Sequence, residues 1–120
     1  MARLKLVGLV MALASCGLAG GRSARCDMQP TTPQCTDWRN SLQPVWTTQE
    51  ALCKTLGGTS VGGTFTANQT CPTTEMWGGC QARMADGSLQ TNWYYKSDKY
   101  KTKESAQAEC ASAMSFVDPS

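Results

Sequence analysis

The chain has 120 residues, of which 17% are charged, seven are cysteine and none is histidine, and its formal net charge is +2. This length suits one small domain. The lack of histidine excludes Ser-His and Cys-His catalytic couples and metal sites built on imidazole. Beyond the first 15 residues, no apolar run approaches the roughly 20 residues of a transmembrane helix.

The first 15 residues have the pattern of an export signal. Arg3 and Lys5 supply a short positive start, and residues 6–14 form an apolar run that is too short to span a membrane. Four residues that end this run resemble the lipobox of bacterial lipoproteins: Leu13, Ala14, Ser15 and Cys16. The resemblance implies cleavage before Cys16, which then becomes an acylated first residue.

An ordinary secretory signal is the alternative. Residues 17–19 also fit a small-x-small cleavage pattern, which would start the mature chain at Gly20 without lipid. Either cleavage exports the protein. Loss of Arg3 and Lys5 leaves nine basic and nine acidic side chains, so the mature chain has no global field that would attract nucleic acid.

Six cysteines remain beyond Cys16, and in a small exported chain they predict a disulfide framework: Cys26, Cys35, Cys53, Cys71, Cys80 and Cys110. Zinc is the rival interpretation, but the chain has no C-x2-C pair and no histidine. Two identical x8 spacings favour the pairs 26–35 and 71–80, which leaves 53–110. This is one of 15 possible connectivities, and spacing alone does not prove it.

The chain order divides into a signal peptide over 1–15, a lipidated tether over 16–36, a cysteine-linked domain over 37–117 and a tail over 118–120. The tether prediction depends on the Gly, Ser, Arg, Pro and Thr content of its sequence. Residues 36–46 carry apolar side chains at irregular spacing with a break at Pro44, which predicts a loop or a helical turn.

Two short helices are expected. Thr47 and Glu50 match a capping box, and Gly57 and Gly58 supply a stop, so the first helix covers about 48–56 with Leu52, Cys53 and Leu56 facing inward. Thr102 is the expected cap of a second helix over about 103–114, with Ala106, Cys110, Ala113 and Met114 on its inner face. Phe116 and Val117 fold back or fray.

Strands are expected between the helices. Residues 59–66 are rich in β-branched side chains and are interrupted by two glycines, which predicts a bulged strand or two short strands. A hairpin over 77–95 is indicated by the Asp86-Gly87 pair, typical of a type I′ turn, and by alternation over 89–95. The predicted fold class is therefore a small α+β domain: a β-hairpin or three-stranded antiparallel sheet with two short helices.

Part of this pattern resembles a family of small cysteine-rich lipoproteins of gliding, predatory soil bacteria. The residues that carry the resemblance cover about half of the chain: Cys53, Gly57, Gly58, Cys71, Pro72, Cys80, Tyr94, Tyr95 and Cys110. It implies an envelope lipoprotein, with a role in surface adhesion or gliding motility. Gly17 after the acylated cysteine resembles the sorting signal for the outer membrane.

No catalytic residue is predicted, and the chain is expected not to be an enzyme and to need no cofactor or metal. Glu75, Asp86 and Asp98 lie near the hairpin, but nine scattered acids supply such groups by chance, and Asp86 is better explained as a turn residue. A thiol nucleophile is excluded if all six cysteines are bonded.

One segment concentrates basic and aromatic residues and is the candidate binding surface: Trp77, Trp93, Tyr94, Tyr95, Lys96, Lys99, Tyr100, Lys101 and Lys103. Stacking rings and lysines suit an anionic polymer or a glycan. Core packing of the strand aromatics is the alternative. The expected function is a non-catalytic outer-membrane lipoprotein, held by lipid, that contacts an envelope protein or glycan. Alternatives are an inhibitor or immunity lipoprotein against an exported hydrolase, and a secreted disulfide-rich effector.

Overall fold

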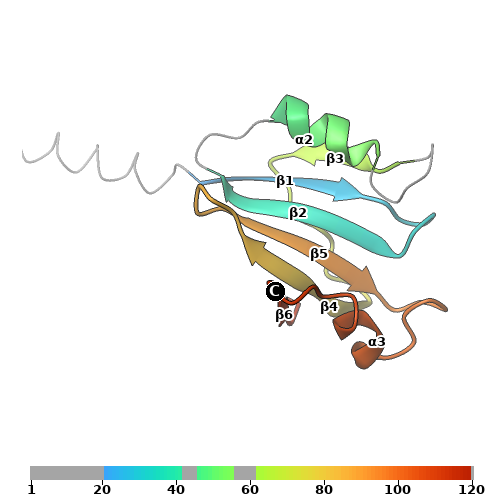
Figure 1. Cartoon of the computed structure of the whole chain (residues 1–120). Helices are drawn as coiled ribbons and strands as arrows, with labels where there is room; N and C mark the ends of the chain where they lie inside the picture. The colour runs from blue at the N-terminus through green and yellow to red at the C-terminus, as the bar shows by residue number, and fades with distance from the viewer. Residues whose placement is uncertain (1–20, 42–45, 56–61, 120) are drawn as a thin grey trace, which may run out of the picture.

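A computed structural model describes residues 21–41, 46–55 and 62–119 (Figure 1). Six strands form one antiparallel sheet in the order β3-β1-β2-β5-β4-β6. Their bounds are β1 Arg22–Asp27, β2 Gln34–Ser41, β3 Thr64–Ala67, β4 Met76–Arg83, β5 Leu89–Tyr95 and β6 Ser115–Val117, and the described helices are α2 Trp46–Cys53 and α3 Lys103–Gln107. The α+β class is confirmed, but the sheet has twice the strands of the three-stranded alternative.

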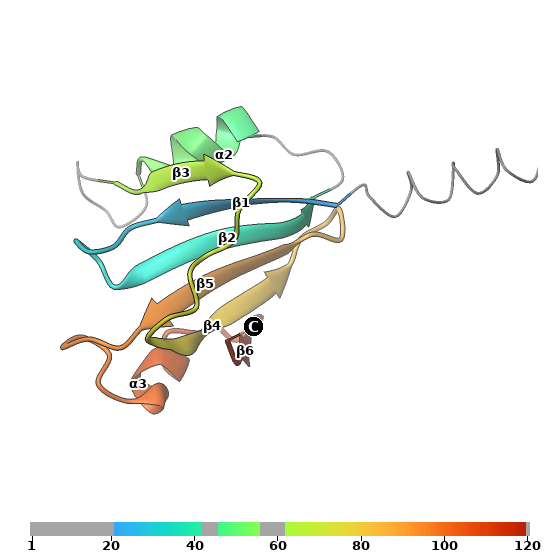
Figure 2. The ribbon, with the colours of Figure 1, turned by 180° about the vertical axis from the view of Figure 1, so that it is seen from behind.

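The two faces of the sheet carry different cover. Cross-strand partners share a face, so the register places Cys26, Trp38, Asn92 and Cys80 on one face, the helix face, and Cys35, Asp37 and Trp93 on the other, the loop face. Both helices lie on the helix face, one near each edge of the sheet (Figure 1). Residues 68–75 cross the loop face from β3 to β4 (Figure 2).

The expected tether is corrected for its second half. Residues 22–27 form β1, which lies inside the sheet between β3 and β2, and Gln34 begins β2. Ala24 and Cys26 are buried with partly exposed residues between them, which is the period-two pattern of a strand. The loop or helical turn expected from residue 36 is also corrected, because β2 continues to Ser41. Residues 16–20 lie outside the described part.

The disulfide pairs are Cys26–Cys53, Cys35–Cys71 and Cys80–Cys110, so the connectivity favoured by spacing is wrong. Cys26 is on the helix face and Cys35 is on the loop face, which prevents their pairing although β1 and β2 are neighbours. The first and last bridges each link the chain around a helix to the sheet, and the middle one fixes the crossing segment. Each closes a loop worth about 3.5 to 4 kcal/mol in the chain-entropy model.

The β4–β5 hairpin is confirmed, with Gly79 opposite Trp93 and Arg83 opposite Leu89. Its turn differs from the prediction, because Gly87 has φ +88° and Asp86 is not among the residues with positive φ, as type I′ would require. Met84 accepts a hydrogen bond from Gly87, and Ser88 accepts one from Met84, which is a three-residue loop with a glycine bulge.

The first helix is confirmed but displaced. It begins at Trp46, so Thr47 lies within its first turn, and it ends at Cys53, which is fully buried. Leu52 was expected to face inward but is 45% exposed. Residues 56–61, which include Leu56 and the start of the predicted 59–66 strand, lie outside the described part. Of the remainder, Gly62 and Gly63 precede β3, which begins at Thr64 and ends at Ala67.

The second helix begins as predicted and ends early. Thr102 is its N-cap and accepts a hydrogen bond from Ser105. The helix stops at Gln107 because the chain turns to bring Cys110 to Cys80, and residues 115–117 then pair with β4 as β6. Ala106 is buried as expected, whereas Ala113 is exposed. Phe116 and Val117 therefore fold back, as a strand.

Candidate functional site

Most aromatic rings of the predicted surface lie in the core. Trp93 and Tyr95 are 1% and 3% exposed and pack on the loop face with Cys35, Cys71 and Met76. Tyr94 and Tyr100 are buried on the helix face, in edge contact at 5.1 Å between ring centroids. Core packing therefore accounts for these four rings, and none of them presents a free face for stacking.

Burial also affects ionisation of the tyrosines. Desolvation, followed by the charges of Tyr100 and Glu109, raises the pKa of Tyr94 to about 12. The pKa values of Tyr95 and Tyr100 are raised as well, chiefly by burial. All three phenols are consequently neutral at physiological pH. Tyr100 Oη is thus a proton donor, and it donates to Glu109 Oε1 at 3.1 Å.

The accessible part of the predicted surface is the segment after β5, where Lys96, Lys99, Lys101 and Lys103 are exposed. Lys96 Nζ lies 4.9 Å from the centroid of the Trp77 ring, and Lys99 Nζ lies 5.5 Å from that of Tyr100. Trp77 is half-buried and donates from Nε1 to the Tyr100 carbonyl at 2.7 Å. Together, Trp77, Lys96, Lys99 and Lys101 form what we call the lysine corner.

Lys103 belongs to a separate pair. Its Nζ lies 2.9 Å from Asp118 Oδ1, and both side chains are exposed. Such a pair contributes at most about 1 kcal/mol to stability. Asp98, Glu104 and Glu109 are also exposed in this region, so its charge is mixed, and Lys103 adds little net positive charge to the lysine corner.

A row of uncharged polar side chains adjoins the lysine corner on the helix face. Gln34 of β2 donates from Nε2 to Tyr100 Oη at 2.9 Å. Asn92 and Gln90 of β5 accept from Thr36 Oγ1 and Trp38 Nε1, each at 2.9 Å. We call Gln34, Gln90 and Asn92 the carboxamide strip. None of these three residues is in the binding surface predicted from the sequence, and alternation over 89–95 indicates only that Gln90 and Asn92 share a face.

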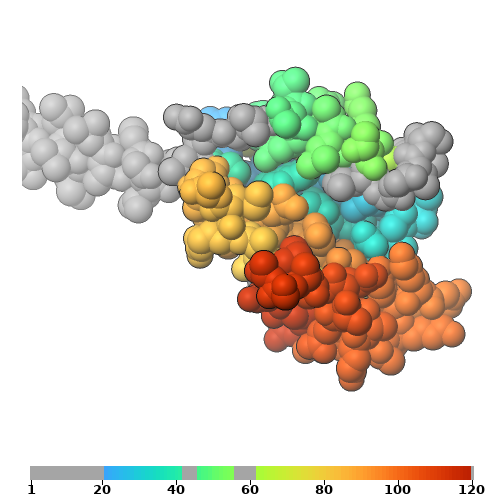
Figure 3. Space-filling view, in the orientation of Figure 1, coloured from blue at the N-terminus to red at the C-terminus, as the bar shows by residue number. Residues whose placement is uncertain are grey.

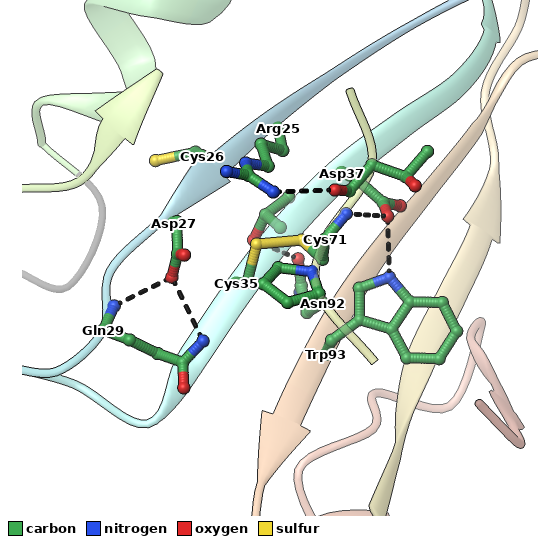
Figure 4. The surroundings of a disulfide bond; sticks show 12 residues. Arg25, Cys26, Asp27, Gln29, Cys35, Asp37, Cys71, Asn92 and Trp93 are labelled. Carbon is green, nitrogen blue, oxygen red and sulfur yellow. Dashed lines mark hydrogen bonds between the residues drawn. A yellow bond between two sulfur atoms is a disulfide. The ribbon is translucent and has the colours of Figure 1, made fainter. Parts of the chain in front are cut away.

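Asp37 is the other group that the sequence analysis missed. It is fully buried on the loop face, and its Oδ2 accepts from Cys71 N and Trp93 Nε1, each at 3.0 Å (Figure 4). Arg39 NH2 lies 3.0 Å from the same oxygen, and its guanidinium carbon lies 5.4 Å from the Trp93 centroid. These contacts connect β2, β5 and the crossing segment.

Asp37 fixes the crossing segment beside the Cys35–Cys71 bridge. Arg25 also donates to the carbonyl of Thr70, and Tyr95 Oη donates to the carbonyl of Pro72. Asp37, Cys35 and Cys71 are buried, which gives the cluster a structural role in holding residues 68–75 on the sheet. A buried Asp in a half-polar strand is indistinguishable by pattern from a surface one, so no sequence signal identified it.

The remaining candidates from the sequence are the turn residue Asp86, a metal site, a membrane helix and Cys16. Asp86 Oδ1 accepts from Ser88 N and Oγ, so it is the turn residue that was expected, and these hydrogen bonds lower its pKa. In the described ranges no group of three or more Cys, Asp or Glu side chains could hold a metal ion. Within the same ranges neither helix is long or apolar enough to cross a membrane. Cys16 lies outside them.

All six cysteines beyond Cys16 are bonded, and disulfides of this kind form and persist in oxidising compartments. The domain is accordingly extracytoplasmic. No protein-family model, no curated protein and no solved structure matches the chain.

Proposed function

We propose that the protein is a non-catalytic component of a bacterial cell envelope, held to the outer membrane by acyl chains on Cys16, which contacts an envelope protein or glycan through the lysine corner. The observation that carries the binding role is the placement of Lys96 against the half-buried Trp77 and of Lys99 beside Tyr100. A cation over an indole ring leaves a charged, partly apolar contact point that the core does not use.

The three disulfides support the compartment, and the lipobox resemblance of Leu13 to Cys16 supports the anchor. A role in surface adhesion or gliding motility rests on the family resemblance alone. Three disulfides also suit a contact module that works outside the cytoplasm, because each one lowers the entropy of the unfolded chain and so stabilises the fold.

Anchoring is tested by the intact mass of the mature protein from its own host, before and after reduction. We expect a chain that begins at Cys16 with acyl mass added, and a gain of six hydrogens on reduction. A chain that begins at Gly20 without lipid would contradict the lipoprotein proposal and favour the secreted effector.

Contact is tested by crosslinking in intact cells that express the full chain. We expect a specific partner for the wild type and its loss in the triple variant Lys96→Gln, Lys99→Gln, Lys101→Gln. The matched control replaces three basic residues elsewhere, Arg22, Lys54 and Arg83, with Gln. Equal recovery of the partner by both triple variants would contradict a role for the lysine corner.

A further inference from the structure

The carboxamide strip has fixed hydrogen-bonding directions. An indole N–H is only a donor, so the group that Trp38 Nε1 contacts on Gln90 must be the carbonyl oxygen, and the Gln90 amide NH2 is turned elsewhere. Tyr100 Oη uses its proton for Glu109, so Gln34 must donate to Tyr100 through its NH2, which leaves the Gln34 carbonyl oxygen as an acceptor.

The strip therefore presents a donor on Gln90 and an acceptor on Gln34. Both glutamine side chains are half-buried and held by their partners. Groups that donate and accept at once, such as sugar hydroxyls, match this arrangement. Since the partners of Gln34 and Gln90 already hold them, a ligand would order few additional side chains on binding.

The residues of β2 and β5 that share the helix face with the strip are uncharged. The helix-face residues of β2 and β5 are Gln34, Thr36, Trp38, Gln90, Asn92 and Tyr94, none of which is charged. The two helices rise from this face on either side, and the strands between them lie lower (Figure 3). Such a floor suits a neutral, hydroxyl-rich stretch of ligand, because no buried charge would be left unpaired.

One end of the strip adjoins the lysine corner. Gln34 contacts Tyr100, Lys99 lies beside the Tyr100 ring, and Trp77 donates to the Tyr100 carbonyl. A ligand that extends along the strip and past Tyr100 thus meets hydroxyl-binding groups first and ammonium groups next. Glu109, which accepts from Tyr100 Oη, and the exposed Asp98 and Glu104 are the acidic neighbours that would oppose an anionic ligand.

We propose that the helix face binds an acidic polysaccharide, whose hydroxyls contact the carboxamide strip and whose carboxylates contact Lys96 and Lys99. This rests on the proposed function and names the class of its partner. Its distinguishing feature is the dependence on two uncharged glutamines, which a purely electrostatic surface would not show.

The experiment is calorimetric titration of the folded, oxidised protein with oligogalacturonate at low salt, and with the same oligomer after methyl esterification. We expect Gln34→Ala with Gln90→Ala to weaken binding of both oligomers at least tenfold. Lys96→Gln with Lys99→Gln should weaken only the acidic one. The control Gln107→Ala, an exposed glutamine of α3, should bind like the wild type, and Glu109→Gln should bind the acidic oligomer two- to threefold more tightly.

Near-ultraviolet circular dichroism of each variant checks that the fold is retained. Wild-type affinity in the double glutamine variant would overturn the inference, as would equal affinity for a single-stranded oligonucleotide, which would indicate charge alone. If the crosslinked partner of the lysine corner is a protein and neither oligomer binds, the inference fails while the proposed function stands. If the crosslink is also lost in the basic control, the proposed function fails independently.

Discussion

The two faces of the sheet use polar side chains in opposite ways. On the loop face, the charged Asp37 is fully buried and receives donors from Cys71, Trp93 and Arg39. On the helix face, the central polar groups are neutral and only half-buried. Asp37 fixes structure because the three donors that meet its Oδ2 come from different segments, while its Oδ1 has no hydrogen-bond partner among the described residues. Neutral amides at the surface instead keep hydrogen-bonding capacity for a ligand.

The largest effect is expected on the loop face, from Asp37→Ala. The change leaves the Cys71 amide and the Trp93 indole without their acceptor, and it removes the carboxylate beside Arg39. We expect the free energy of unfolding to fall by about 4 kcal/mol, measured by urea unfolding. The control is Asp27→Ala, because Asp27 of β1 also lies on the loop face but is partly exposed, and we expect a loss below about 1 kcal/mol. Equal losses would contradict the contrast.

Removal of the Cys35–Cys71 bridge is expected to cause the next largest loss of stability. The double change to Ala opens a loop of 36 residues in sequence separation, and we expect a loss of about 3 to 4 kcal/mol in the same urea assay. Hydrogen exchange should rise first at residues 68–75. Faster exchange in α3 instead would show that the crossing segment is not what the bridge holds.

The dependence of stability on alkaline pH tests the helix face, where Tyr94 is buried. The folded pKa of Tyr94 is about 12 against an ordinary value near 10, so the unfolded chain loses its proton first. The stability that this tyrosine contributes is complete below about pH 10 and declines as the pH rises through about 12, by about 3 kcal/mol. Unfolding followed against pH for wild type and Tyr94→Phe measures it; identical slopes would refute the assignment.

The smallest effect is expected from Thr36→Val, which removes the hydrogen bond to Asn92 Oδ1 at 2.9 Å while nearly keeping side-chain volume. Asn92 is half-buried, so water replaces the lost donor in part, and the free energy of unfolding should fall by about 1 kcal/mol. A loss as large as that of Asp37→Ala would show that the helix face, too, depends on a closed polar network.

Local patterns predicted the hairpin, the cap at Thr102 and the disulfide content, because each depends on neighbouring residues. The sequence did not reveal that residues 22–27 are an inner strand, since Arg22 and Arg25 interrupt the only apolar alternation there. The cysteine pairing could not be predicted either, because it depends on which sheet face Cys26 and Cys35 occupy, a property of register. The burial of Asp37 could not be predicted, because its partners come from β5 and from the crossing segment, which are distant in the sequence.

The disulfides also divide the chain in a way that the sheet does not. Two bridges lie within residues 26–71 and the third within residues 80–110, so none of these three bridges spans the short stretch from 72 to 79. One backbone cut there would yield two separately cross-linked fragments. Non-covalent contacts, chiefly the pairing of β2 with β5 and the side-chain hydrogen bonds across it, would then hold the fragments together. The two halves could serve as a complementation pair that reports assembly of the sheet.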